Sequence, residues 1–106
     1  MDIADWRKKI DALDLRLVEL LNERAQAVQE IGRLKRNTNM PIYEPMREKF
    51  IFENVSKANQ GPLPDGELRH VFERIIDVMR NIQKVEIHPK AADTGGSTEF
   101  DIDVND

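Results

Sequence analysis

Residues 3–37 read IADWRKKIDALDLRLVELLNERAQAVQEIGRLKRN, and this stretch decides the fold. Its apolar residues recur at alternating steps of three and four, which is the spacing of a helix packed along its whole length. Asp2 can cap the start of such a helix, and the basic residues near its end suit the helix dipole. The stretch therefore predicts one helix from about Ile3 to Asn37. The expected apolar stripe consists of Ile3, Trp6, Ile10, Leu13, Leu17, Leu20, Ala27, Ile31 and Leu34.

A helix of this length measures about 50 Å at 1.5 Å per residue. That is longer than the diameter of a compact domain built from so short a chain. The remaining residues are too few to cover the whole apolar stripe. The length of the helix therefore predicts a second copy of the chain, packed against the first as a homodimer.

Prolines and glycines divide the rest of the chain. A second helix is expected to begin near Glu44 and Pro45, since proline suits the first helical position. A third is expected from about Asp65 to Val85. No strand pattern or internal repeat interrupts them, so the predicted fold class is all-α, a three-helix chain. The expected inner faces are Phe50, Ile51, Val55 and Ala58 on the second helix, and Leu68, Phe72, Ile75, Ile76, Met79 and Ile82 on the third.

Charge is unevenly distributed along the 106 residues, whose net charge is −4. Residues 1–85 carry 15 basic and 14 acidic residues, whereas residues 86–106 carry one basic and six acidic residues. A near-neutral body argues against nucleic-acid binding, which needs a clearly basic face. We predict one helical domain over residues 1–88 and an acidic tail over residues 89–106. The tail is rich in Gly, Ser, Thr and Asp, a composition typical of disorder.

Several site classes are excluded by composition. The chain has no cysteine, so it holds no disulfide, thiolate metal site or cysteine nucleophile. His70 and His88 have no partner at metal-ligand spacing, so no metal site is expected. The first residues lack the basic stretch and apolar core of a signal peptide, and no apolar run reaches the roughly 20 residues that cross a bilayer. These features predict a cytoplasmic protein without membrane contact.

Arg24 breaks the apolar stripe of the first helix. A charge on a packed seam costs several kcal/mol unless it is paired. Lys35 lies eleven residues later and returns to within about 20° of the same face. Two interpretations remain open for this pair. In one, Arg24 reaches solvent or meets a carboxylate across the interface, and Lys35 is a favourable charge in the last turn of the helix. In the other, the two cations form an anion site inside the helical bundle.

Arg7 lies about 100° around the helix from Arg24 and roughly 25 Å away. It cannot serve the same site within one chain, although an antiparallel partner helix would bring a second Arg7 there. The alternative is an ordinary exposed arginine.

Further polar residues on the other two helices have two interpretations as well. Glu44, Arg47 and Glu48 share a face of the second helix, either as local ion pairs or as part of a site. Gln83 continues the apolar line of the third helix, where its amide can bind a ligand or a backbone group. Together the polar residues describe a cation-rich pocket suited to a small dianion, with no nucleophile and no proton relay.

Several segments, taken in their order along the chain, resemble the all-helical chorismate mutases. The likeness spans residues 3–86, and the ordered set is more specific than any single piece. The segments are Trp6-Arg7-Lys8-Lys9-Ile10-Asp11-Ala12-Leu13-Asp14, Leu20-Leu21-Asn22-Glu23-Arg24, Ile31-Gly32-Arg33-Leu34-Lys35, Pro41-Ile42-Tyr43-Glu44-Pro45-Met46-Arg47-Glu48 and Phe72-Glu73-Arg74-Ile75-Ile76 with Gln83.

The resemblance implies an intertwined dimer whose long first helices cross and whose sites are shared between chains. It implies that Arg24 and the partner's Arg7 hold the two carboxylates of chorismate. By the same resemblance, Lys35 and Gln83 bind the ether oxygen.

The resemblance also assigns residues around the ring. Glu48 takes the ring hydroxyl, and Arg47 lines the pocket near it. Two positions depart from the family. Glu44 stands where aspartate is frequent, and Met79 replaces a serine that helps to hold a carboxylate in some members.

The activity implied is the rearrangement of chorismate to prephenate in aromatic amino-acid synthesis, which needs no cofactor because the bonds shift within one molecule. Three alternatives remain. An isochorismate pyruvate-lyase would use nearly the same cations on an isomer of the substrate. A regulatory subunit would dock on another shikimate-pathway enzyme, for which the tail segment from Glu99 to Val104 could add a strand. In a plain coiled-coil dimer Arg24 would have no functional role, and Arg24→Leu would stabilise the protein without loss of function.

Overall fold

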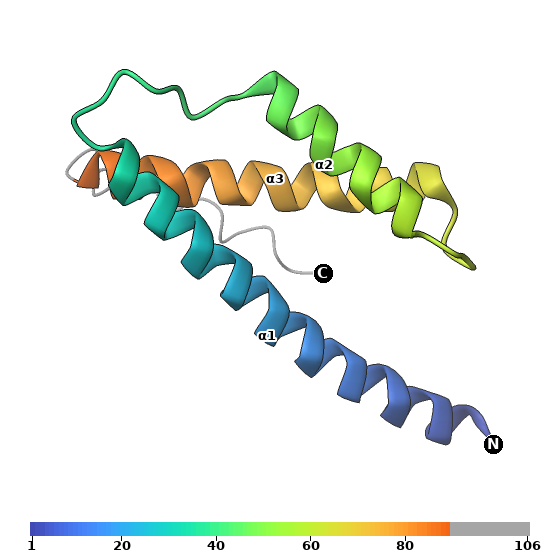
Figure 1. Cartoon of the computed structure of the whole chain (residues 1–106). Coiled ribbons are helices and arrows are strands. Elements are labelled where there is room, and N and C mark those ends of the chain that lie inside the picture. Colours follow the sequence, from blue (N-terminus) through green and yellow to red (C-terminus); the bar gives the residue numbers. More distant parts are fainter. Residues whose placement is uncertain (90–106) are drawn as a thin grey trace.

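The computed structural model describes residues 1–89 as three helices without a strand (Figure 1). They are α1 (Ile3–Lys35), α2 (Pro45–Ala58) and α3 (Asp65–Ile87). The all-α class predicted from the sequence is confirmed. The predicted acidic tail, including its proposed docking segment, lies outside the described residues except for Pro89.

The ends of α1 follow from local hydrogen bonds. The backbone N–H of Asp5 donates to the Asp2 carboxylate at 2.9 Å, and the N–H of Asp2 donates to Asp5 at 3.2 Å, so the start is a capping box. The helix ends two residues earlier than predicted. Asn37 adopts a left-handed backbone conformation with φ of 62°, and the Thr38 hydroxyl donates to the carbonyl of Lys35 at 2.5 Å. Lys35 therefore occupies the last turn of α1.

The boundaries of α2 and α3 agree with the sequence to within two residues. Glu44 is the residue before the first turn of α2, and Pro45 opens that turn. Helix α3 begins at Asp65 as predicted and continues to Ile87. Its expected stripe faces inward: Ile76 and Met79 are buried, and Leu68, Phe72, Ile75 and Ile82 are partly buried.

Helix α3 is the element against which the other two pack. It contacts both α1 and α2, whereas α1 and α2 do not pack against each other. In Figure 1 the C-terminal part of α1 crosses the C-terminal part of α3, and α2 crosses the N-terminal half of α3. Val28 of α1 joins Ile76 and Met79 in the small buried core. This arrangement leaves a space bounded by all three helices.

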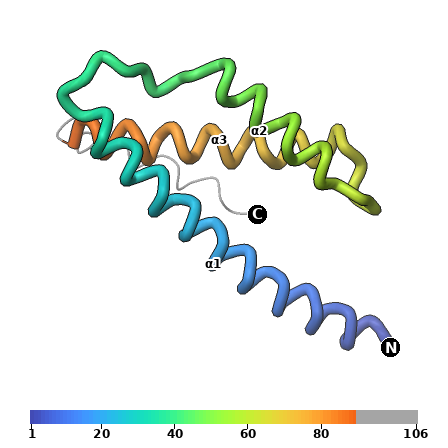
Figure 2. Tube along the Cα trace, in the orientation of Figure 1, coloured from blue at the N-terminus to red at the C-terminus, as the bar shows by residue number. Residues whose placement is uncertain are grey.

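The N-terminal part of α1 extends away from the other helices (Figure 2). The radius of gyration is 16.6 Å, whereas a compact chain of this length has about 12–13 Å. The apolar residues predicted to pack along this helix are open in the single chain, with Leu17 55% and Leu34 78% exposed. Ile3, Trp6, Ile10, Leu13 and Leu20 are exposed too. Within residues 1–89, none of the helices has the length and apolar character needed to cross a bilayer.

Gly32 sets the distance between α1 and α3. A Cβ at this position would lie 2.7 Å from the Cβ of Glu86 and 3.2 Å from the carbonyl oxygen of Gln83. Both distances are shorter than normal contacts, and the second atom belongs to the backbone. A side chain at position 32 would therefore push the two helices apart.

We expect Gly32→Ala to lower the free energy of unfolding by about 1–3 kcal/mol, the usual cost of overpacking. Gly66→Ala is the matched control, because it also places alanine in a helix but meets no atom within 4 Å. Urea unfolding of both variants measures the difference. If Gly32→Ala were as stable as Gly66→Ala, the close approach would not constrain the helix pair.

Candidate active site

A pocket of about 330 Å³ lies between the three helices. Its size falls in the range of small-molecule sites. Apolar side chains form part of the wall and charged side chains the rest. The lining residues are Arg24, Ala27, Val28 and Ile31 from α1, Ile42 and Glu44 from the connection, Arg47, Glu48 and Ile51 from α2, and Ile76, Met79, Arg80 and Gln83 from α3.

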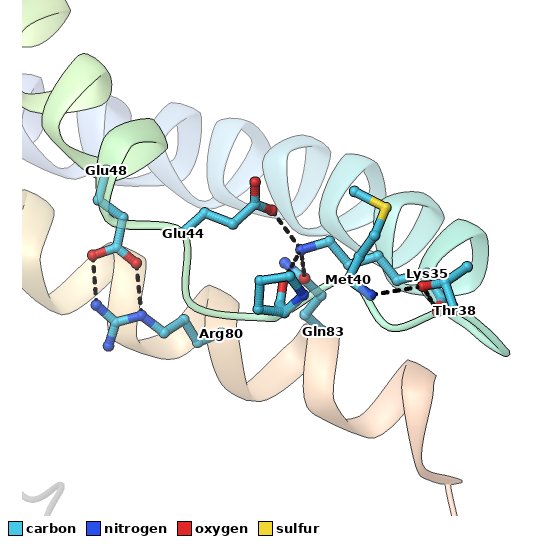
Figure 3. A network of polar contacts seen from close by, with 8 residues as sticks. Lys35, Thr38, Met40, Glu44, Glu48, Arg80 and Gln83 are labelled. Atoms are coloured by element: carbon cyan, nitrogen blue, oxygen red, sulfur yellow. Dashed lines mark hydrogen bonds and ion pairs between the residues drawn. The ribbon is translucent and has the colours of Figure 1, made fainter.

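Lys35 lies at one end of this pocket, where its ammonium bonds two of the lining residues, Glu44 and Gln83 (Figure 3). The residue is only 4% exposed. Its Nζ donates to the Pro41 carbonyl at 2.6 Å, to Glu44 Oε2 at 2.6 Å and to Gln83 Oε1 at 2.7 Å. An ammonium has three N–H groups, so every donor of Lys35 has an acceptor. This satisfies the requirement for burying a charge.

The bond to Lys35 fixes the orientation of the Gln83 amide. An ammonium only donates, so Gln83 must present its oxygen to Lys35. The NH₂ group of the amide then points away from Lys35, and no acceptor within residues 1–89 is bonded to it. Because Gln83 lines the pocket, this amide is a free donor for a ligand oxygen.

Arg24 and Arg47 bring unpaired positive charge into the pocket. Neither forms an ion pair or hydrogen bond with another residue in the described part of the chain, although Arg47 lies 5.7 Å from the centre of the Phe50 ring. Burial lowers the pKa of Arg24, and the nearby charge of Arg47 lowers this pKa further. A partly buried cation beside a second positive charge forms a site that an anion would stabilise.

The two acidic residues at the start of α2 pair across helices and not locally. Glu44 binds Lys35 of α1, and Glu48 binds Arg80 of α3 at 2.6 and 2.8 Å. Neither carboxylate pairs with Arg47 among the described residues. The interpretation of Glu44, Arg47 and Glu48 as a locally paired surface is therefore wrong. Their pairing leaves Arg47 available to a ligand.

Met79 is buried and adds an apolar wall to the pocket. Arg7 belongs to the extended N-terminal part of α1 and does not line the pocket of its own chain.

Arg80 is a pocket residue that the sequence reasoning did not identify. A signal was available, because Arg80 lies four residues after Ile76 and three before Gln83, on the same face of α3. An arginine on the edge of an inward-facing stripe needs a partner, and Glu48 is that partner. With Lys35 included, four cations and two carboxylates surround the pocket, which leaves an excess of two positive charges.

The family model for chorismate mutase type II matches residues 6–84. The chain belongs to the type II chorismate mutase family. The matched range contains all of α2, all of α1 except its first three residues and all of α3 except its last three, and with them every residue that lines the pocket. The resemblance noted in the sequence is thereby confirmed.

Relatives of this chain come from several organisms. A chorismate mutase (form II) structure from Thermus thermophilus is 34% identical, with a TM-score of 0.74, and the match covers 77% of this chain and 93% of that one. The chorismate mutase of Methanocaldococcus jannaschii is 29% identical over 77% of this chain and 84% of its own length. The bifunctional chorismate mutase/prephenate dehydratase of Aquifex aeolicus is 36% identical over 78% of this chain but 24% of its own length. The chain thus spans about a quarter of that bifunctional relative.

Replacing Arg24 tests whether its positive charge lies in the pocket without a partner. We expect Arg24→Leu to raise the free energy of unfolding of the ligand-free protein by about 1 kcal/mol, because a desolvated cation is removed from an otherwise apolar helix face. Arg16→Leu, at an exposed position of the same helix, should change stability by less than about 0.5 kcal/mol. Urea unfolding provides both values. A destabilised Arg24→Leu variant would mean that Arg24 has a partner in the assembled protein.

Proposed function

We propose that this chain is a chorismate mutase that converts chorismate to prephenate. The observation that carries the proposal is the unpaired Arg24 and Arg47 in one pocket with Gln83, whose amide is held by Lys35. Family membership and the names of the relatives support it.

Substrate binding follows from the charges of the pocket. Chorismate is a dianion, and the six charged groups around the pocket carry two more positive than negative charges. Arg24 takes one carboxylate, with Arg47 near the ring, and a guanidinium suits a carboxylate because it can donate two parallel hydrogen bonds. Binding also removes the repulsion between the two arginines, so part of the electrostatic cost of the empty site is released when the substrate enters.

The reaction needs a compact substrate and donors at the breaking bond. As the C–O bond lengthens, negative charge grows on the ether oxygen. Gln83 has a free NH₂ group for that oxygen. Lys35 can contribute once the oxygen replaces one of its three acceptors, and Glu44 is the suitable one to leave because its side chain is 41% exposed. Positioning lowers the barrier by holding the reacting carbons together, and preorganised donors stabilise the developing charge.

We further propose that residues 1–88 act as one domain within an intertwined homodimer. The exposed stripe of α1 supports this, because leaving so many large apolar side chains in water is costly. An antiparallel partner helix would bring the second Arg7 to the pocket, where it would meet the other carboxylate. Each active site would then be completed by its neighbour.

Leu17→Glu tests the dimer. Leu17 belongs to the exposed stripe, so a charge there should convert a dimer of about twice 12.3 kDa into monomers. Leu15→Glu is the control, since Leu15 is 69% exposed on the opposite face of α1. Sedimentation equilibrium measures both masses. If Leu17→Glu remains dimeric, or if the unchanged protein is a monomer, the proposed interface is wrong.

The activity itself is tested by following the loss of chorismate absorbance and identifying the product. We expect prephenate well above the uncatalysed rate. Lys35→Ala should then lower kcat by about 10²- to 10³-fold, the usual effect of losing one donor to a developing oxyanion. Thr38→Ala is the control, because Thr38 bonds the Lys35 carbonyl but does not line the three-helix pocket. A Lys35→Ala enzyme of unchanged kcat would contradict the assigned role.

A protein without mutase activity would direct attention to the alternatives. Pyruvate release from isochorismate would identify a lyase using the same cations. Inactivity on both substrates would favour a docking subunit for another shikimate-pathway enzyme. The name of the Aquifex aeolicus relative supports this alternative, because it joins a chorismate mutase to a prephenate dehydratase.

A further inference from the structure

We propose that Arg80 is a positioning residue that holds Glu48 ready for the ring hydroxyl of the substrate and away from the arginines that receive its carboxylates. The inference rests on the proposed mutase function and extends it to a residue outside the expected set.

The geometry of the pair is bidentate (Figure 3). Arg80 Nε donates to Glu48 Oε2 at 2.8 Å, and Arg80 Nη2 donates to Glu48 Oε1 at 2.6 Å. Two parallel bonds fix the direction of the carboxylate as well as its distance. Glu48 is 15% exposed in its side chain, so little solvent competes for it.

Arg80 is itself held from two other sides. Its Nη1 donates to Asp77 at 2.9 Å on the preceding turn of α3, and its guanidinium lies 5.1 Å from the centre of the Tyr43 ring. The hydrogen bond to Glu48 raises the pKa of Arg80, and the charges of Glu48 and Asp77 raise this pKa further, against the effect of desolvation. The guanidinium is therefore a fixed support against which Glu48 is aligned.

Glu48 needs such a support because its helix provides little. It lies in the first turn of α2, a helix without a buried residue, and the Glu44 side chain does not cap that turn. Arg24 and Arg47 are two unpaired cations in the same pocket among the described residues. A Glu48 side chain released from Arg80 would be attracted to them and would occupy the place of a substrate carboxylate.

Pairing with Arg80 leaves Glu48 able to accept further hydrogen bonds. Each carboxylate oxygen has two lone-pair sites, and Arg80 uses one on each oxygen. Glu48 can therefore accept a hydrogen bond from the substrate hydroxyl while it remains fixed. A hydrogen bond that is aligned in advance costs less ordering when the substrate binds.

The experiment compares kcat and KM of four enzymes: the unchanged protein, Arg80→Met, Glu48→Gln and the double variant. Arg80→Met should lower kcat/KM by roughly 10- to 100-fold, as expected for losing a charged hydrogen-bonding partner, with KM raised because Glu48 competes with the substrate. In the Glu48→Gln background the same change should have less than about a threefold effect, since coupled residues are not additive.

Two further variants separate positioning from folding. Arg80→Lys keeps the charge but not the two parallel bonds, so its kcat/KM should lie between those of the unchanged protein and Arg80→Met. Arg69→Met is the matched control: Arg69 lies 4.5 Å from the centre of the Phe52 ring, another cationic contact between α3 and α2, but outside the three-helix pocket. It should leave kcat/KM within about twofold of the unchanged enzyme.

The outcomes distinguish this inference from the proposed function. If the unchanged protein forms no prephenate, the proposed function fails and the role of Arg80 fails with it. If prephenate forms but Arg80→Met lowers kcat/KM by the same factor with and without the Glu48→Gln substitution, only the role of Arg80 is overturned. The same conclusion follows if Arg69→Met is as damaging as Arg80→Met, because the contact would then serve only to join the helices.

Discussion

The buried ammonium of Lys35 is the constraint on which the arrangement of the three helices depends. Its three acceptors come from the connection after α1, from the residue that precedes α2 and from α3. A charge that is 4% exposed is tolerated only while all its donors are bonded. The position of each helix end is therefore tied to the others. Gly32 lies one turn earlier on α1 and allows the close approach to α3 that brings Gln83 within reach of Lys35.

The same chain leaves a long apolar helix face without cover. Only Val28, Ile76 and Met79 are buried apolar side chains within residues 1–89, a core too small to stabilise a domain of this length alone. The exposed stripe of α1 has the regular spacing of an interface. Folding and assembly are thus expected to be one process, in which the second chain supplies both the missing apolar contacts and the second Arg7.

The sequence predicted the helices well because periodicity and capping are local. Asp2, Pro45 and the three–four spacing placed the helix boundaries to within two residues. The spacing of eleven residues also placed Arg24 and Lys35 on nearly the same helix face, where Arg24 lines the pocket and Lys35 bonds two of the other lining residues. Pairing across helices could not be obtained in this way, since it depends on which helices are adjacent. Glu44 and Glu48 were equally compatible with partners on their own helix. The role of Arg80 as the partner of Glu48 follows only from the packing of α3 against α2.

The cations of the pocket fall into two groups with opposite roles. Lys35 and Arg80 are bonded to carboxylates and hold donors and acceptors in place, so they contribute order before a substrate arrives. Arg24 and Arg47 have no such partners among the described residues, and burial works against the charge of Arg24. A pocket in which all four were paired would be more stable but would have no attraction for a dianion. A pocket in which none was paired would bind anions without orienting them. The division between paired and unpaired cations therefore gives this site both affinity and a fixed geometry, and it requires that Glu48 stay with Arg80 and that Glu44 leave Lys35 only when a substrate oxygen takes its place.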